Sequence, residues 1–265
     1  MIESNFMVKT GIFAIVQARV GSTRLPNKVL TEIVDKPLLW HIVDRLGKVN
    51  DIDEVIVATS TLPENDILYN FSKNNNIACF RGSEDDVLSR FYEAALSKSA
   101  KHIIRITADC PLVDPYVISD LIKYYFDSSF DFCGIACGAG VSNEKNVLRY
   151  PDGLDAEIFS FEVLKNAFKN ATELLHREHV TPYIWKNKNK FNTGVLFPKK
   201  NDYSAYRFTI DNEEDLKMIK SIYNQLYSKD HIFTFNDAIK LIKQNKIKVN
   251  NKHLIGKEGY DEFWK

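Results

Sequence analysis

Two hydrophobic periodicities alternate along the first half of the chain. Short, mainly apolar runs are typical of buried strands, and they occur at residues 12–16, 54–59, 77–80, 102–107 and 130–135. Amphipathic stretches with helical spacing separate them, at residues 38–46, 64–73, 84–97 and 115–126. Strands that alternate with helices predict a largely parallel sheet with right-handed crossovers. The loops that bind ligands should then share one edge of this sheet, and they follow Ala18, Thr59, Phe80 and Thr107.

The second half of the chain is less regular. Strand patterns occur at residues 154–159, 191–197 and 206–210, and helical patterns at 161–169, 173–186, 212–226 and 235–243. Residues 138–151 are polar and predict a loop, and the Lys/Asn-rich segment after Gln244 predicts a surface tail. We find no internal repeat and no linker. We therefore expect one α/β domain over residues 1–245, with an inserted or appended lobe at about 138–200 and a C-terminal tail at 246–265.

Composition excludes several classes of partner. Lys+Arg 35 balances Asp+Glu 35 in the 265 residues, so no overall basic field exists for nucleic acid or a membrane surface. No apolar run approaches the roughly 18 residues of a membrane span, and the N-terminus lacks the pattern of a secretory signal. Cys79, Cys110, Cys133 and Cys137 show no disulfide framework and no second ligand pair for zinc, which favours reduced thiols and a cytoplasmic protein.

The loop after the first strand carries the clearest candidate chemistry. Arg19, Arg24 and Lys28 place three cations around Gly21 and Ser22. A loop that leads from a strand towards a helix presents backbone N–H groups to an anion, and Arg and Lys add charged phosphate contacts. The glycine patterns of a P-loop and of a dinucleotide fingerprint are absent. The spacing therefore predicts a triphosphate cradle, and a solvated basic loop is the alternative.

Two aspartates stand where strands end. Asp109 directly follows the strand at 102–107, and Asp211 follows the one predicted at 206–210. Mg²⁺ prefers oxygen ligands and often uses one or two protein carboxylates together with substrate phosphates. Both residues are therefore candidate magnesium ligands. The alternative for Asp109 is a turn or cap residue, and for Asp211 it is the N-cap of the following helix.

Further polar residues could contact a second substrate. Asp155 and Glu157 alternate around a strand start and should share one face, where they could bind acceptor hydroxyls or simply be solvated. His176 and His179 lack the spacing of zinc proteases, and two histidines three residues apart on a helix favour structural or substrate-side roles. Ser83 stands before the helix predicted at 84–97 and is expected to cap it.

Taken together, these stretches resemble the cytidylyltransferases that activate acidic sugars, particularly the spore-coat-polysaccharide type. The matching segments run in the family's order, at residues 17–28, 81–88, 107–115, 152–157, 177–182 and 207–216. The resemblance implies a nucleotide-diphosphosugar-transferase fold, which is a Rossmann-like, mostly parallel sheet flanked by helices, together with Mg²⁺ dependence and a homodimer. It further implies that Asp109 and Asp211 hold the metal, and that the loop from Arg19 to Lys28 binds the triphosphate of CTP.

The resemblance also assigns the remaining site residues. The residues expected to bind nucleotide are Ala18, Arg19, Gly21, Ser22, Arg24, Lys28, Arg81, Gly82, Ser83 and Asp109. Those expected to bind a small acidic sugar-like acceptor are Asp155, Glu157, Arg177, His179 and Arg207, the last as a clamp for a carboxylate or phosphate. Arg19, Arg24 and Lys28 are expected to stabilise charge during the reaction.

Departures from better-understood relatives leave the acceptor open. The 3-deoxy-manno-octulosonate cytidylyltransferases carry a His-x-Ser-Gly-Thr-Glu-Arg stretch where this chain has residues 81–87, and the sialic-acid enzymes differ at residues 24–26. Two other classes would fit the same residues. One is a metal-dependent glycosyltransferase that consumes a finished sugar nucleotide, and the other is a binding protein without turnover.

Overall fold

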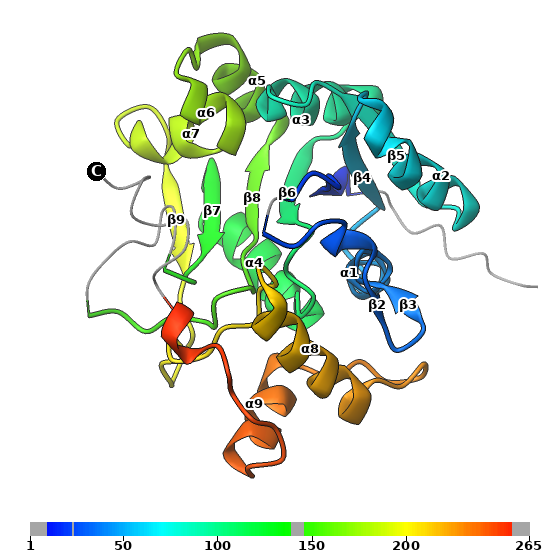
Figure 1. Cartoon of the computed structure of the whole chain (residues 1–265). Coiled ribbons are helices and arrows are strands. Elements are labelled where there is room, and N and C mark those ends of the chain that lie inside the picture. Colours follow the sequence, from blue (N-terminus) through cyan, green and yellow to red (C-terminus); the bar gives the residue numbers. More distant parts are fainter. Residues whose placement is uncertain (1–9, 23, 139–145, 256–265) are drawn as a thin grey trace, which may run out of the picture.

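The computed structural model describes residues 10–22, 24–138 and 146–255. Its centre is a seven-stranded sheet in the order β5-β4-β1-β6-β8-β7-β9 (Figure 1). The strands are β1 (Ile12–Gln17), β4 (Glu54–Ser60), β5 (Ala78–Gly82), β6 (His102–Thr107), β7 (Phe132–Ile135), β8 (Glu157–Ser160) and β9 (Thr193–Leu196). Within this sheet β8 runs antiparallel to both neighbours, and the other pairings are parallel. The largely parallel α/β sheet expected from the sequence is confirmed.

Strand β1 separates two apolar cores because its side chains alternate between the faces of the sheet. Ile12, Ala14 and Val16 pack into one core, and Phe13 and Ile15 pack into the other. All five side chains are buried. A strand buried on both faces explains why the sequence at this position is a continuous apolar run instead of an alternating one.

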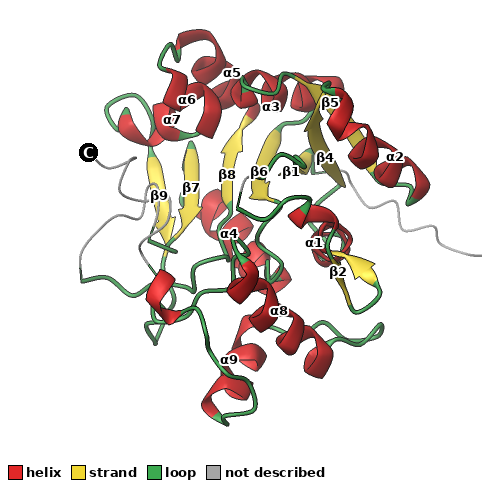
Figure 2. Ribbon diagram, in the orientation of Figure 1, coloured by secondary structure: helices red, strands yellow, loops and turns green. Residues whose placement is uncertain are grey.

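Helices cover both faces of the sheet (Figures 1 and 2). Helices α1 (Leu38–Leu46), α4 (Pro115–Asp127), α8 (Glu213–Leu226) and α9 (Phe235–Lys243) pack on the first core. Helices α3 (Val87–Ser97), α5 (Phe161–Asn170), α6 (Leu174–His179) and α7 (Pro182–Lys186) lie on the side of the second core. Helix α2 (Asp66–Asn74) flanks β4 and β5. The short elements are β2 (Glu32–Ile33), β3 (Lys36–Pro37) and the 3-10 helices Lys28–Leu30, Pro63–Asn65 and Lys252–Leu254.

Most predicted elements appear with ends shifted by a few residues, but one helix, one helix cap and one strand differ from the expectation. The predicted helix at 173–186 is two helices, because Val180 adopts a positive φ of 70° and Pro182 starts α7. Asp86, not Ser83, caps α3 by accepting from the Ser89 backbone N–H at 2.9 Å. The predicted strand at 206–210 is an extended segment with one isolated bridge, between Asp152 and Arg207.

The tail is not entirely a surface segment. Asn251 is fully buried, and its side-chain amide donates to Asp215 Oδ1 at 2.7 Å. Ile247 is also buried. Within the predicted tail at 246–265, the residues up to 255 therefore pack partly against the rest of the molecule. Residues 256–265 lie outside the described part.

The segment at 138–200 contributes to the central sheet as well as to the helices α5, α6 and α7. It supplies β8 and β9, and residues 139–145 lie outside the described part. The aromatic residues Tyr183, Trp185 and Phe191 are buried in the second core. All four cysteines are unpaired. No helix among the described residues is long and apolar enough to cross a bilayer.

Candidate active site

The cationic loop leaves β1 at the edge of the sheet where the carboxyl ends of the parallel strands meet. Hydrogen bonds hold its start, because Ala18 N–H donates to the Ala58 carbonyl at 3.1 Å and Val20 N–H donates to Asn65 Oδ1 at 3.0 Å. Arg19 and Arg24 remain about half exposed on this loop, at 55% and 52% of their side chains. They are therefore accessible to an anionic ligand.

Lys28 lies deeper and joins two distant acids. Its ammonium donates to Asp109 Oδ2 and Asp211 Oδ1, both at 3.1 Å, and to the Ile210 carbonyl at 2.9 Å. Burial alone would lower the pKa of Lys28, but the charges of Asp109 and Asp211 outweigh it and raise that pKa. Burial raises and Lys28 lowers the pKa of Asp109, and the net result is a lowered pKa. Both groups are therefore ionised at neutral pH.

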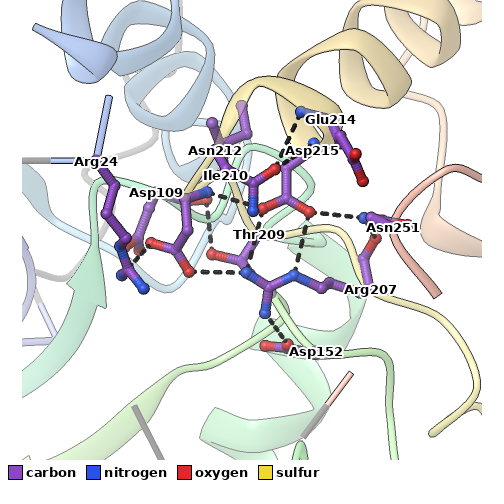
Figure 3. A network of polar contacts seen from close by, with 12 residues as sticks. Arg24, Asp109, Asp152, Arg207, Thr209, Ile210, Asn212, Glu214, Asp215 and Asn251 are labelled. Atoms are coloured by element: carbon purple, nitrogen blue, oxygen red, sulfur yellow. Dashed lines mark hydrogen bonds and ion pairs between the residues drawn. The ribbon is translucent and has the colours of Figure 1, made fainter. Parts of the chain in front are cut away.

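Backbone pairing brings the two acids together. The extended segment 206–211 runs beside the end of β6, where Ile210 N–H donates to the Asp109 carbonyl at 2.8 Å and Thr209 Oγ1 donates to the same oxygen at 3.2 Å (Figure 3). On its other side, Phe208 N–H donates to the Asp152 carbonyl at 2.7 Å. The segment therefore links the end of β6 to the residues before β8.

Arg207 is the buried centre of an acidic network (Figure 3). Its guanidinium donates to Asp152 Oδ2 at 2.7 Å, to Asp211 Oδ2 at 2.8 Å and to Asp215 Oδ1 at 3.1 Å. Only 1% of its side chain is exposed. The structure therefore places Arg207 beneath the acids, where it fixes Asp211, and not on an open surface that an acceptor could reach.

The helix that follows Asp211 is capped by its neighbour. The Asn212 side chain accepts from the backbone N–H groups of Glu214 at 3.0 Å and Asp215 at 3.1 Å. Both carboxylate oxygens of Asp211 instead face cations, since Arg24 and Lys28 contact Oδ1 and Arg207 contacts Oδ2. The alternative in which Asp211 is only a helix cap is therefore wrong.

A second group of acids lies next to this network. Glu157 forms an ion pair with Arg105 at 2.9 Å and accepts from Thr181 Oγ1 at 3.0 Å. Arg105 also donates to Gln17 Oε1 at 3.2 Å. Asp155 accepts from the Gly153 backbone N–H at 3.0 Å.

Sequence reasoning missed Arg105 and Thr181. A charged residue inside the apolar strand at 102–107 was the available signal for Arg105. Thr181 lies in the matching segment at 177–182, but no role was predicted for it.

Burial raises the proton affinity of two of these acids, Asp155 and Asp152. It raises the pKa of Asp155 to about 7, helped by the charges of Asp152, Asp109 and Glu157. It also raises the pKa of Asp152 to about 6, against the opposing charge of Arg207.

A cleft of about 600 Å³ opens beside the loop. It is lined by residues 17–19 and 84–87, by Arg90 of α3, and by Leu174, Arg177, Glu178 and His179 of α6. The cleft therefore brings Ala18 and Arg19, expected to bind nucleotide, together with Arg177 and His179, expected to bind acceptor. Burial and the charges of Arg105 and Arg19 lower the pKa of His179 to about 4, so its ring is neutral at pH 7.

The other expected residues make structural contacts. Arg81 donates to the carbonyls of Ser60 and Leu62 and pairs with Asp66 at 2.7 Å. Ser83 Oγ accepts from the Asp86 N–H, and Ser22 Oγ accepts from the Leu25 N–H. Arg177 pairs with Asp86 and donates to the Phe168 carbonyl at 2.7 Å. A Cβ at Gly82 would lie 3.1 Å from Arg90, whereas one at Gly21 would meet nothing within 4 Å.

The donor set at Asp109 and Asp211 suits a hard cation. Their carboxylates already converge on one ammonium, together with a backbone carbonyl. Among the described residues no cluster of three or more His, Cys, Asp or Glu side chains could hold a metal alone. Two carboxylates supplemented by substrate phosphates fit Mg²⁺ better than a structural zinc site.

Comparison with known proteins identifies the family. The family model for cytidylyltransferase matches residues 13–254. The spore coat polysaccharide biosynthesis protein SpsF of Bacillus subtilis is 32% identical over 240 residues, which cover 88% of this chain and 95% of that protein. An uncharacterised protein of Methanocaldococcus jannaschii is 38% identical over 208 residues, 78% of this chain and 81% of that one. The solved structure of a cytidylyltransferase from Leptospira borgpetersenii is 30% identical, has a TM-score of 0.79, and is matched over 89% of this chain and 95% of that one. This chain belongs to the cytidylyltransferase family.

Proposed function

We propose that the chain transfers CMP from CTP to a small, acidic, sugar-like acceptor and releases pyrophosphate, in the synthesis of a surface polysaccharide or glycoconjugate precursor. The observation that carries the proposal is the convergence of Lys28, Asp109 and Asp211 from three segments at the ligand-binding edge of the sheet. Membership of the cytidylyltransferase family supports CTP as the donor.

The loop cations account for triphosphate binding in this proposal. Arg19 and Arg24 are exposed enough to meet phosphate oxygens, and Lys28 lies below them. Each can offset negative charge on the phosphates and on the leaving pyrophosphate. The cleft beside Ala18 has room for the nucleoside, and Arg177 and His179, which also line it, would then contact the acceptor.

Asp109 and Asp211 would hold Mg²⁺. When bound, this ion supplies a Lewis acid that polarises phosphate oxygens. The oxygen donors of the two aspartates fit that role, and Arg207 fixes the orientation of Asp211.

The chemical step is an in-line displacement at the α-phosphorus. An acceptor oxygen forms the new O–P bond, the bond to the β-phosphate bridging oxygen breaks, and its electron pair leaves with pyrophosphate. The protein contributes chiefly by positioning the reactants and stabilising charge. Glu157, which is held by Arg105 and Thr181, would orient the acceptor.

Three further properties belong to the same proposal. We expect a homodimer in which residues of about 138–200 form the dimerisation or acceptor lobe of a domain spanning 1–245. The unpaired thiols fit a cytoplasmic enzyme.

The first experiment is thermal unfolding with Mg²⁺ and each of CTP, UTP, GTP, ATP and several CMP-sugars. A nucleotide present at about 100 times its dissociation constant should add roughly 2.7 kcal/mol to the free energy of unfolding. We expect a shift with CTP that disappears on chelation of Mg²⁺. A shift with finished sugar nucleotides alone would favour a glycosyltransferase, and no shift with any nucleotide would contradict the proposal.

A further inference from the structure

Each cation of the loop after β1 has an acidic partner, and one of these acids lies apart from the proposed metal site. Arg24 and Lys28 both contact Asp211. Arg19 instead forms an ion pair with Glu84, from Nη1 to Oε1 at 3.2 Å. Glu84 belongs to the turn between β5 and α3 and lines the same cleft as Arg19. The start of the cationic loop therefore has an acid of its own.

Glu84 is the fixed member of this ion pair. Its side chain is 18% exposed, against 55% for Arg19. Its second carboxylate oxygen accepts from the side-chain amide of Asn65 at 3.3 Å. Its backbone is held as well, because the buried guanidinium of Arg90 donates to the carbonyls of Ser83 and Glu84. The acid is therefore anchored on both its carboxylate and its backbone, and it sets the position of the exposed arginine.

Asn65 connects this acid to the backbone of the loop. Its side chain is buried, and its amide is hydrogen-bonded at both ends. Oδ1 accepts from Val20 N–H at 3.0 Å, and Nδ2 donates to Ser60 Oγ at 2.8 Å in addition to Glu84. The amide thus supplies the acceptor and both donors that its partners use. One buried side chain holds the residue that follows Arg19 and also the carboxylate that Arg19 contacts.

The ion pair leaves Arg19 able to bind a second anion. A guanidinium has several N–H donors in a rigid fork, and the contact with Glu84 is made through Nη1. A carboxylate that fixes one edge of the fork reduces the side-chain freedom that is lost when a ligand binds. The charge of Glu84 also repels phosphate, but the charge of Arg90, which acts on the same carboxylate, offsets this repulsion.

We propose that Glu84 is a positioning residue for the triphosphate. Held by Asn65, it orients Arg19 so that the remaining edge of the guanidinium meets phosphate oxygens. Glu84 then acts on CTP through Arg19 and makes no contact with the phosphates itself. This inference rests on the proposed function, which assigns CTP to the loop.

The test is a double-mutant cycle on the Kd of CTP with Mg²⁺, measured by isothermal titration calorimetry. The proteins are wild type, Glu84→Gln, Arg19→Gln and the double variant. We expect Glu84→Gln to raise the Kd about 3- to 10-fold while Arg19 is present, and to leave it unchanged where Arg19 is already Gln. Glu54→Gln is the control, because it breaks a partly exposed ion pair with Lys98 at the start of β4, and it should leave the Kd unchanged.

Two results would overturn the assignment. An unchanged or lower Kd in Glu84→Gln would show that Glu84 does not prepare Arg19 for the ligand. An equal rise with and without Arg19 would show that Glu84 acts only through the fold.

Inorganic tripolyphosphate, titrated into the same four proteins, separates these results from failure of the proposed function. Wild type that binds tripolyphosphate with the expected pattern, but does not bind CTP, would contradict the proposed function and keep the role of Glu84. Wild type that binds neither ligand would overturn both.

Discussion

At the scale of single residues, Lys28 connects the charged parts of the site. One ammonium satisfies two carboxylates from segments 81 and 183 residues away in the sequence. Its side chain is 13% exposed, so both ion pairs are shielded from water and from salt more than surface pairs would be.

Replacing Lys28 by Met should lower turnover by about 10²- to 10³-fold, because one preorganised charge at the phosphates is lost. Pyrophosphate release from CTP measures the effect. Lys48→Met is the matched control, since Lys48 forms an exposed pair with Asp44 on α1. Near-wild-type turnover in Lys28→Met would contradict the assigned role.

Gly153 is a second residue with a specific requirement. Gly153→Ala should lower the free energy of unfolding by roughly 1–3 kcal/mol or more, because it combines a positive φ with a backbone clash at Thr209. Urea unfolding measures this. Gly21→Ala is the control for stability, since a Cβ there meets nothing within 4 Å. Equal losses in both variants would show that the close approach at Gly153 is unimportant.

At the scale of elements, two adjacent residues at the start of α8 have different roles, one in capping the helix and the other in contacting the cations of the site. Asn212 caps the helix, and Asp211 faces the cations. Asn212→Ala should cost about 1 kcal/mol of unfolding free energy and keep its turnover per folded molecule.

Asp211→Asn should show the opposite pattern. It keeps the cap at Asn212, but it loses one charge at the proposed Mg²⁺ site, so turnover should fall at least about 10²-fold and require more Mg²⁺ for saturation. Chemical unfolding and a Mg²⁺ titration of pyrophosphate release distinguish the two variants. Full activity in Asp211→Asn would remove Asp211 from the proposed site.

The same elements show how far sequence reasoning extends. The proximity of Asp109 and Asp211 is predicted from acids at strand ends, although residues 206–210 form an extended segment with one isolated bridge and not a strand of the sheet. Asp215 and Asn251 could not be predicted, since an acid in the first turn of a helix and an Asn in a polar tail usually face water. Their burial depends on Arg207, whose partners lie up to 55 residues away. The break at Val180 could have been predicted, because Pro182 stands inside the helical pattern at 173–186 and a proline there ends or interrupts a helix.

At the scale of the whole molecule, pH should act through groups whose protonation differs between the folded and unfolded chain. The pKa of His179 falls from an ordinary value of 6.5 to about 4 in the fold. Between these values the unfolded chain binds a proton that the folded chain does not, so His179 lowers stability as the pH falls from 6.5 towards 4. Asp155 has the opposite effect, because its pKa is raised to about 7 in the fold. It increases stability as the pH falls below 7, over a range that overlaps that of His179.

His179→Gln should therefore lose less stability than wild type between pH 6.5 and 4. Urea unfolding at several pH values measures the difference between the two proteins, in which the shared contribution of Asp155 cancels. His253→Gln serves as the control, because His253 is 58% exposed. Parallel pH profiles for wild type and His179→Gln would show that His179 has no depressed pKa.

The contact between Arg24 and Asp211 spans 187 residues of sequence. During synthesis on a ribosome, the loop that supplies the first cations emerges early, and its second acidic partner is translated only after more than three quarters of the chain. The strands β1, β4, β5 and β6 can pair before that point, but the charged centre cannot close. A growing chain can therefore form part of its central sheet well before Arg24 can pair with Asp211. A chain whose synthesis stops before residue 211 lacks this second acid.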